Sequence, residues 1–152
     1  MKATSFAHIL CGVDGSVEAC RAARVAAHLA EAFGAKLTFV TVAVDVASTL
    51  ELDCYKRTEK IDPTSSVALV EDDAEVCLTV ALEIASAEGV PNAGRVVRTG
   101  DVAKAILSLG AELAADTVVL GHHDRSRMGR AFKAPVSARV ADAGGMTVVL
   151  VP

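Results

Sequence analysis

The chain has 152 residues, of which 52% are hydrophobic and only 3% aromatic, and it contains no Trp. This length fits a single domain, residues 1–152, and the composition excludes a disordered chain. The formal net charge of −4 argues against nucleic acid or an anionic membrane as the main partner.

Apolar runs closed by turn residues alternate with amphipathic stretches along the chain. In chain order, we predict a strand over His8–Val13, a helix from its cap Ser16 to Gly34, a strand over Lys36–Val44, and a helix from Asp72 or Asp73 to Gly89. A strand over Arg95–Thr99, a helix after Gly100-Asp101, a strand over Thr117–Leu120, a helix starting at Pro135 and a strand over Met146–Val151 complete the chain.

This alternation predicts a parallel sheet covered by helices on both faces, with His8–Val13 and Thr117–Leu120 as central neighbours. The connection from about Asp45 to Val70 is too long for an ordinary α/β loop. We interpret it as a lid, a binding loop or a partly disordered segment.

Cysteine usage and the chain start bear on location. The cysteines are scattered without a CxxC pair, which favours reduced thiols. The N-terminus lacks the apolar core and cleavage site of a signal peptide, and no apolar run approaches the roughly 20 residues of a membrane span. We therefore expect a cytoplasmic protein without a membrane segment. The cysteines are Cys11, Cys20, Cys54 and Cys77.

Polar residues follow two of the predicted strands, where ligands of open parallel sheets bind. Asp14 follows the first strand within Gly12–Ser16, and Gly121-His122-His123-Asp124 follows the fourth. A carboxylate can accept bonds from ribose hydroxyls, and a loop of glycine and cations can hold phosphates. Alternatively, Asp14 is only a turn residue and the basic loop only a solvated surface, and the residues alone leave both interpretations open. The cations of that loop are Arg125, Arg127, Arg130 and Lys133.

We find no pattern for catalysis or for a metal. Adjacent side chains such as His122-His123-Asp124 rarely converge on one ion. Ser16 lies outside a GxSxG elbow, and the GxGxxG and Walker GxxxxGK(S/T) motifs are both absent. We therefore predict neither catalytic residues nor metal ligands.

Several short motifs, in this order and spacing, resemble the universal stress protein family over nearly the whole chain. The resemblance implies a doubly wound α/β fold of the adenine-nucleotide alpha-hydrolase-like type, with a five-stranded parallel sheet in the order 3-2-1-4-5. It also implies a homodimer, often formed through the last strand, and ATP binding in some members. The motifs are Asp14-Gly15-Ser16 after a strand, TFVTVAV, Gly100-Asp101 before a helix, TVVLGHHD and VSARVADAG.

ATP-binding members of that family carry Gly-x2-Gly-x9-Gly-Ser/Thr after the fourth strand. Gly121 and His123 match the family, but Asp124 stands at the second glycine. Ala134 and Pro135 replace the final Gly-Ser/Thr pair. The resemblance therefore implies that the phosphate half of the site is largely lost. The remaining phosphate-side candidates are Arg125, Arg127, Arg130 and Ser137.

The adenosine half of the site is better kept. Asp14 matches the family's ribose-contacting Asp, while Gly12, Val13 and Val42 fall where the adenine pocket would be. We therefore expect a stress-response module with a degenerate adenine-nucleotide site that binds ATP weakly. The alternatives are a homodimeric interaction protein with an unidentified protein partner and no physiological nucleotide, and, last, a slow nucleotide hydrolase. No catalytic base and no acidic pair for Mg²⁺ support the hydrolase.

The last strand, Met146–Val151, is apolar except for one Thr. If it is an edge strand, it would recruit a second copy of the chain, because unpaired apolar edges bind other strands. The alternative is a central strand buried within the monomer.

Overall fold

The computed structural model describes residues 6–43, 63–122 and 135–152, with only the backbone described for 63–72. Strands and helices alternate throughout these ranges. Their order is β1 (His8–Gly12), α1 (Val17–Phe33), β2 (Lys36–Ala43), α3 (Pro63–Ala87), β3 (Gly94–Thr99), α4 (Val102–Glu112), β4 (Thr117–Gly121), α5 (Val136–Ala143) and β5 (Thr147–Val151).

In the described residues, the strands form one parallel five-stranded sheet in the order β3-β2-β1-β4-β5. Ile9 of β1 pairs with Leu37 of β2 on one side and with Thr117 of β4 on the other. The fold class, the strand order and the central position of β1 beside β4 are therefore as predicted. The edge position of β5 is also settled, since it pairs with β4 alone among the described strands.

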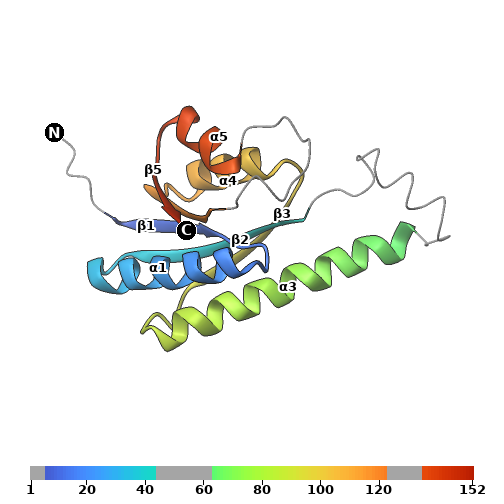
Figure 1. Cartoon of the computed structure of the whole chain (residues 1–152), viewed down its shortest axis with the longest axis horizontal. Helices are drawn as coiled ribbons and strands as arrows, with labels where there is room; N and C mark the ends of the chain where they lie inside the picture. The colour runs from blue at the N-terminus through green and yellow to red at the C-terminus, as the bar shows by residue number, and fades with distance from the viewer. Residues whose placement is uncertain (1–5, 44–62, 123–134) are drawn as a thin grey trace.

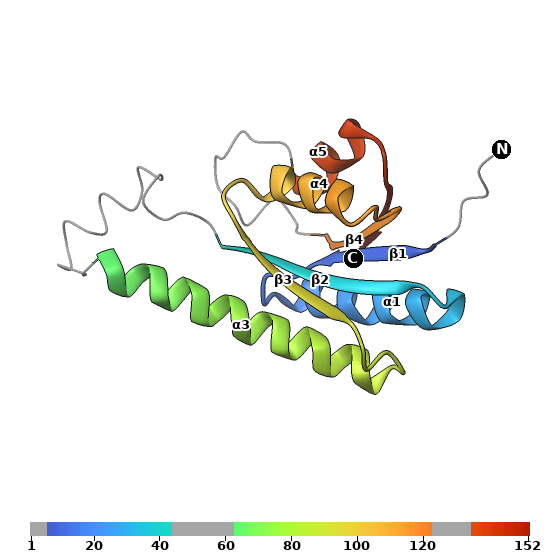
Figure 2. The same cartoon turned by 180° about the vertical axis from the view of Figure 1, so that it is seen from behind.

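Helices α1 and α3 cover one face of the sheet, and α4 and α5 cover the other (Figures 1 and 2). Successive side chains of a strand point to opposite faces. Ile9 and Cys11 thus enter the core beneath α1 and α3, while Leu10 enters the core beneath α4 and α5. The buried face of α1 consists of alanines, which lets this helix lie close to the strands. They are Ala19, Ala22, Ala23, Ala26, Ala27 and Ala30.

The ends of α1 follow the predicted pattern. Ser16 adopts an extended backbone, and its Oγ accepts a hydrogen bond from the Ala19 N–H at 3.1 Å. Gly34 ends the helix in the left-handed region at φ +63°, where a residue without Cβ is favoured. Both residues act as the sequence predicts.

The predicted start of the second helix at Asp72 or Asp73 is wrong, because α3 begins at Pro63. We took Pro63 and the Thr64-Ser65-Ser66 cluster as loop residues. A proline at the first helical position loses no hydrogen bond, and its fixed φ suits a helix start. The predicted connection, which runs to Val70, therefore extends eight residues too far, over residues 63–70 of the helix. Its part within 44–62 lies outside the described residues.

Helix α4 contains a glycine in its interior, Gly110, which is buried. A Cβ at this position would lie 2.6 Å from Sδ of Met146, the residue directly before β5. Glycine costs a helix about 1 kcal/mol relative to alanine. That cost is offset by the space that the missing Cβ leaves for the Met146 side chain.

One further property concerns membranes. Across the parts of the chain that the structure describes, no helix combines the length and the apolar character that crossing a bilayer requires.

Candidate functional site

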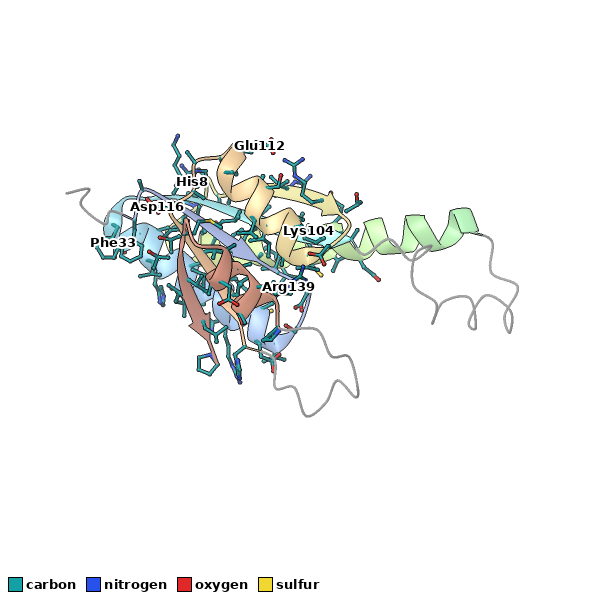
Figure 3. All side chains as sticks on the ribbon, turned by 90° about the horizontal axis from the view of Figure 1, so that it is seen from above. His8, Phe33, Lys104, Glu112, Asp116 and Arg139 are labelled. Atoms are coloured by element: carbon teal, nitrogen blue, oxygen red, sulfur yellow. The ribbon has the colours of Figure 1, made fainter. Side chains whose placement is uncertain are left out.

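The carboxyl ends of β1 and β4 form the switch point of the sheet, because the chain continues from β1 towards β2 and reaches β4 from the other side. Lys104 and Arg139 lie at this end of the sheet, whereas His8 and Asp116 lie at the opposite end (Figure 3). The loop from Val13 to Ser16, together with Gly121 and His122, therefore lies at the end of the sheet where a ligand is expected.

The loop after β1 is fixed by local hydrogen bonds. The Val13 N–H donates to the Val40 carbonyl at 2.9 Å, which continues the pairing of β1 with β2. Asp14 is exposed, and its Oδ1 accepts a bond from the Ser16 N–H at 3.0 Å. Gly15 between them has φ +82°. Asp14 is thus a turn residue, which is one of the two interpretations of the sequence, and its carboxylate is exposed at the strand end.

The two glycines assigned to the site are explained by packing. A Cβ on Gly121 would lie 2.7 Å from the carbonyl carbon of Glu18, so the end of β4 touches the backbone of the first turn of α1. A Cβ on Gly12 would lie 2.9 Å from Leu120 Cδ2. These contacts hold the strand ends and α1 together whether or not a ligand is present.

The two valines assigned to the adenine pocket do not converge. Val13 belongs to the core on the α1 and α3 face and is 7% exposed. Val42 is half-buried and packs against the core on the α4 and α5 face, which is also where a Cβ on Gly12 would point. The alternation of strand side chains causes this separation. Gly12 and Val42 therefore face the same side of the sheet, and Val13 faces the other.

A carboxylate–guanidinium pair joins α4 to α5 on the same edge. Arg139 donates from Nη1 to Asp101 Oδ2 at 3.0 Å and from Nη2 to Oδ1 at 2.9 Å. The Lys104 N–H also donates to Oδ1 at 3.0 Å, so Asp101 caps α4 as predicted. The bonds from Arg139 and then from Lys104 lower the pKa of Asp101 from 3.8 to about 2. The sequence pattern identified the cap but not its partner, which is 38 residues away.

The phosphate side is only partly described. Ser137 is half-buried in α5, and Pro135 precedes that helix without a side-chain cap bond. His122 is exposed, and its N–H donates to the Val151 carbonyl at 2.7 Å. Within the described ranges no group of three or more His, Cys, Asp or Glu side chains is placed to hold a metal. The candidates His123, Arg125, Arg127 and Arg130 lie outside the described residues.

Two hollows lie elsewhere in the described residues, and neither is lined by Gly12 or Val42. A polar hollow of about 370 Å³ at the amino end of the strands is lined by His8, Lys36, Thr38 and Asn92. Its walls are joined by a 2.8 Å hydrogen bond between His8 Nε2 and Thr38 Oγ1. An apolar groove of about 130 Å³ lies between α1 and α3. The sequence did not reveal this groove, because it depends on how two helices far apart in the chain pack.

Together these features define a doubly wound α/β domain with an exposed carboxylate at its switch point. The sequence profile of the Universal stress protein family matches residues 5–152, and the chain belongs to that family. A comparison with curated proteins found no match.

Solved structures of universal stress proteins share the fold. Universal stress protein UspA from Lactobacillus plantarum superposes with a TM-score of 0.77 at 21% identity, over 97% of this chain and 99% of that one. A universal stress protein in complex with cAMP gives 0.68 at 23% identity, over 97% and 98%. The protein from Archaeoglobus fulgidus in complex with dAMP gives 0.62 at 20% identity, over 97% and 98%.

Proposed function

We propose that this protein is a stress-response binding module whose carboxyl-end crevice takes an adenine nucleotide of low charge. The observation that carries the proposal is the exposed Asp14 carboxylate, held in a fixed turn at the end of β1. In that place it can accept a bond from a hydroxyl of the nucleotide sugar. Two structural relatives are complexes with cAMP and dAMP, which both carry a single phosphate.

The preference for low charge comes from the sequence after β4. Asp124 stands where ATP-binding members have a glycine, and it adds a negative charge on the phosphate side. Two like charges about 4 Å apart cost on the order of 4 kcal/mol at an effective dielectric constant near 20. Pro135 also lacks the N–H and hydroxyl of the Ser/Thr that it replaces. The binding affinity of a triphosphate is therefore reduced more than that of a monophosphate.

Calorimetry with adenosine, AMP, cAMP and ATP tests this proposal. We expect AMP or cAMP to bind more tightly than ATP, and the Asp124→Gly variant to regain ATP affinity with little change for adenosine. Micromolar or tighter binding of ATP by the wild type, unaffected by Asp124→Gly, would show that the low-charge proposal is mistaken. Phosphate release after ATP addition, which we expect to be absent, tests the hydrolase alternative in the same samples.

The edge strand supports a second candidate function, a homodimeric interaction protein. Leu150 in β5 is 44% exposed, although a strand residue of this size is normally covered. A second copy pairing with β5 about a two-fold axis would cover it and satisfy the free strand edge. This candidate needs no nucleotide.

Light scattering tests the dimer. We expect the wild type to have twice the monomer mass at micromolar concentration and Leu150→Lys to be monomeric. Leu150 is a better target than Val149, which packs against the core on the α1 and α3 face, so that a lysine there would also disturb the fold. Val17→Lys is the matched control, because Val17 is an equally apolar residue, 63% exposed on α1. A monomeric wild type contradicts this candidate.

A further inference from the structure

Two thiols from different helices line the apolar groove between α1 and α3. Cys20 lies on α1 and Cys77 on α3, and both border the same space of about 130 Å³. Each is half-buried, so small reagents in solution can reach it. Cys11, by contrast, is fully buried beneath these helices.

Cys77 also contacts the loop that carries Asp14. A Cβ on Gly15 would lie only 2.9 Å from Cys77 Sγ, so the sulfur packs directly on the Gly15 backbone. Gly15 is the middle residue of the turn closed by the bond from Ser16 N–H to Asp14 Oδ1. Any movement of the Cys77 sulfur therefore changes the support beneath this turn.

The charges around Cys77 point to the same connection. Burial raises the pKa of the Cys77 thiol, and the negative charges of Asp14 and Asp73 and the neighbouring Cys20 thiol raise it further. Since the thiolate is the reactive form, the reactivity of Cys77 depends on the charge of Asp14. Among the groups that raise this pKa, Asp14 is the group that a ligand in the crevice would contact.

We propose that Cys20 and Cys77 form a thiol pair that a peroxide converts to a disulfide, and that this oxidation is coupled to ligand binding at Asp14. One thiol is oxidised to a sulfenic acid as the O–O bond of the peroxide breaks and water leaves. The second thiol then attacks that sulfur, the S–S bond forms, and a second water carries away the hydroxyl. Two electrons and two protons pass from the thiols to the peroxide.

Disulfide formation and ligand binding are coupled through the contact between Cys77 and Gly15. Because the Cys77 sulfur packs on the Gly15 backbone, a disulfide that draws this sulfur towards Cys20 would take it away from that contact. A ligand that holds the Asp14 turn in place therefore makes formation of the disulfide less favourable. By linkage, the disulfide lowers the affinity for that ligand by the same factor. This half of the inference rests on the proposed function, whereas the disulfide itself does not.

The first experiment asks whether the disulfide forms. The full chain carrying Cys54→Ser, which removes the thiol outside the described residues, is treated with hydrogen peroxide, alkylated and digested. We expect mass spectrometry to find the Cys20–Cys77 peptide, and Cys20→Ser and Cys77→Ser each to abolish it, while Cys11→Ser leaves it unchanged. A folded, peroxide-treated chain in which Cys20 and Cys77 both stay alkylatable overturns the thiol pair.

The second experiment tests the link between Asp14 and Cys77 without any nucleotide. We measure the rate of Cys77 alkylation by iodoacetamide against pH. In Asp14→Asn the midpoint of this profile should shift to lower pH, because one of the charges that raise the Cys77 pKa is gone. Glu83→Gln, which removes an exposed carboxylate elsewhere on α3, is the matched control and should leave the midpoint in place. An unchanged midpoint in Asp14→Asn overturns the link.

The third experiment measures the coupling. We expect saturating AMP to slow the peroxide-driven disulfide, and the oxidised protein to bind AMP more weakly than the reduced protein. Equal AMP affinity in both forms overturns the coupling. If AMP binds neither form, the proposed function fails, while the peptide analysis and the Asp14→Asn profile still decide whether the thiol pair exists and responds to Asp14.

Discussion

Two aspartates begin helices at the same edge of the sheet, and their surroundings differ. Asp101, before α4, accepts bonds from the Lys104 N–H and from both terminal nitrogens of Arg139, and its side chain is 28% exposed. Asp14, before α1, closes a turn through the Ser16 N–H and is exposed, while Ser16 itself caps the helix. Asp101 alone caps α4 with its side chain, whereas at α1 Ser16 makes the cap bond and Asp14 closes the turn before it.

This difference separates a structural carboxylate from one suited to a ligand. At α4 the charge of Asp101 is neutralised by Arg139 within the protein. At α1 the cap bond to the Ala19 N–H is made by Ser16, and Asp14 accepts a bond from the Ser16 N–H while remaining exposed. A site that must accept ribose hydroxyls is therefore better served by Asp14, although both residues follow a strand and precede a helix.

The largest expected effect comes from disturbing the contact between the end of β4 and the first turn of α1, the helix that follows Asp14. Gly121→Ala would force a Cβ to within 2.7 Å of the Glu18 carbonyl carbon and push the first turn of α1 off the sheet. We expect the free energy of unfolding to fall by about 1–3 kcal/mol, as for other overpacked sites. Chemical denaturation measures it. Gly12→Ala is the control with a smaller loss, because its Cβ meets only the side chains of Leu120 and Ile106, which can shift.

Exchanging the two aspartates for alanine sharpens the comparison. Asp14→Ala should weaken AMP or cAMP binding roughly tenfold, equivalent to about 1.4 kcal/mol, because a charge-assisted bond to the ribose is lost. Its melting temperature should change little. Asp101→Ala should do the reverse, lowering the melting temperature with little effect on affinity. Calorimetry and thermal melting on both variants check this, and equal effects of the two substitutions on affinity would refute the division of roles.

The smallest expected effect is the loss, in acid, of the stability that the ionised Asp101 contributes at neutral pH. The pKa of Asp101 is lowered from 3.8 to about 2, so its ionised form is favoured by the folded state. This contribution to stability is complete above the unfolded value and is lost as the pH falls from 3.8 to about 2. We therefore expect the melting temperatures of wild type and Asp101→Asn to differ most at neutral pH and to approach each other over this acid range. A difference independent of pH contradicts the assignment.

Local patterns in the sequence predict the five strands and the caps of α1 and α4, whereas the order of the strands in the sheet was implied by the family resemblance. A strand such as His8–Val13 is indicated by its own residues. A helix cap is indicated by a residue next to the helix end, as at Ser16, Gly34 and Asp101. Local patterns did not predict the start of α3. Pro63 and the residues after it are common both in turns and in the first turn of a helix, so their types do not distinguish the two.

The candidate site was only partly predictable, because it depends on contacts between distant segments. The position of Asp14 at a strand end followed from the sequence, but the side of the sheet that each valine faces did not. Val13 and Val42 belong to opposite cores. The Asp101–Arg139 pair and the contact of Cys77 with Gly15 join residues from separate helices and loops, and no spacing rule within one element reports such pairs.

The Gly110–Met146 contact has a consequence for how the chain can change. Because a Cβ on Gly110 would coincide with the Met146 sulfur, each of the two positions limits what the other can become. A larger residue in α4 is compatible with the fold only if the residue before β5 becomes shorter, so the two positions should vary together among descendants of this sequence. Met146 lies directly before the edge strand, which begins at Thr147, so the Gly110 position also lies against the start of that strand.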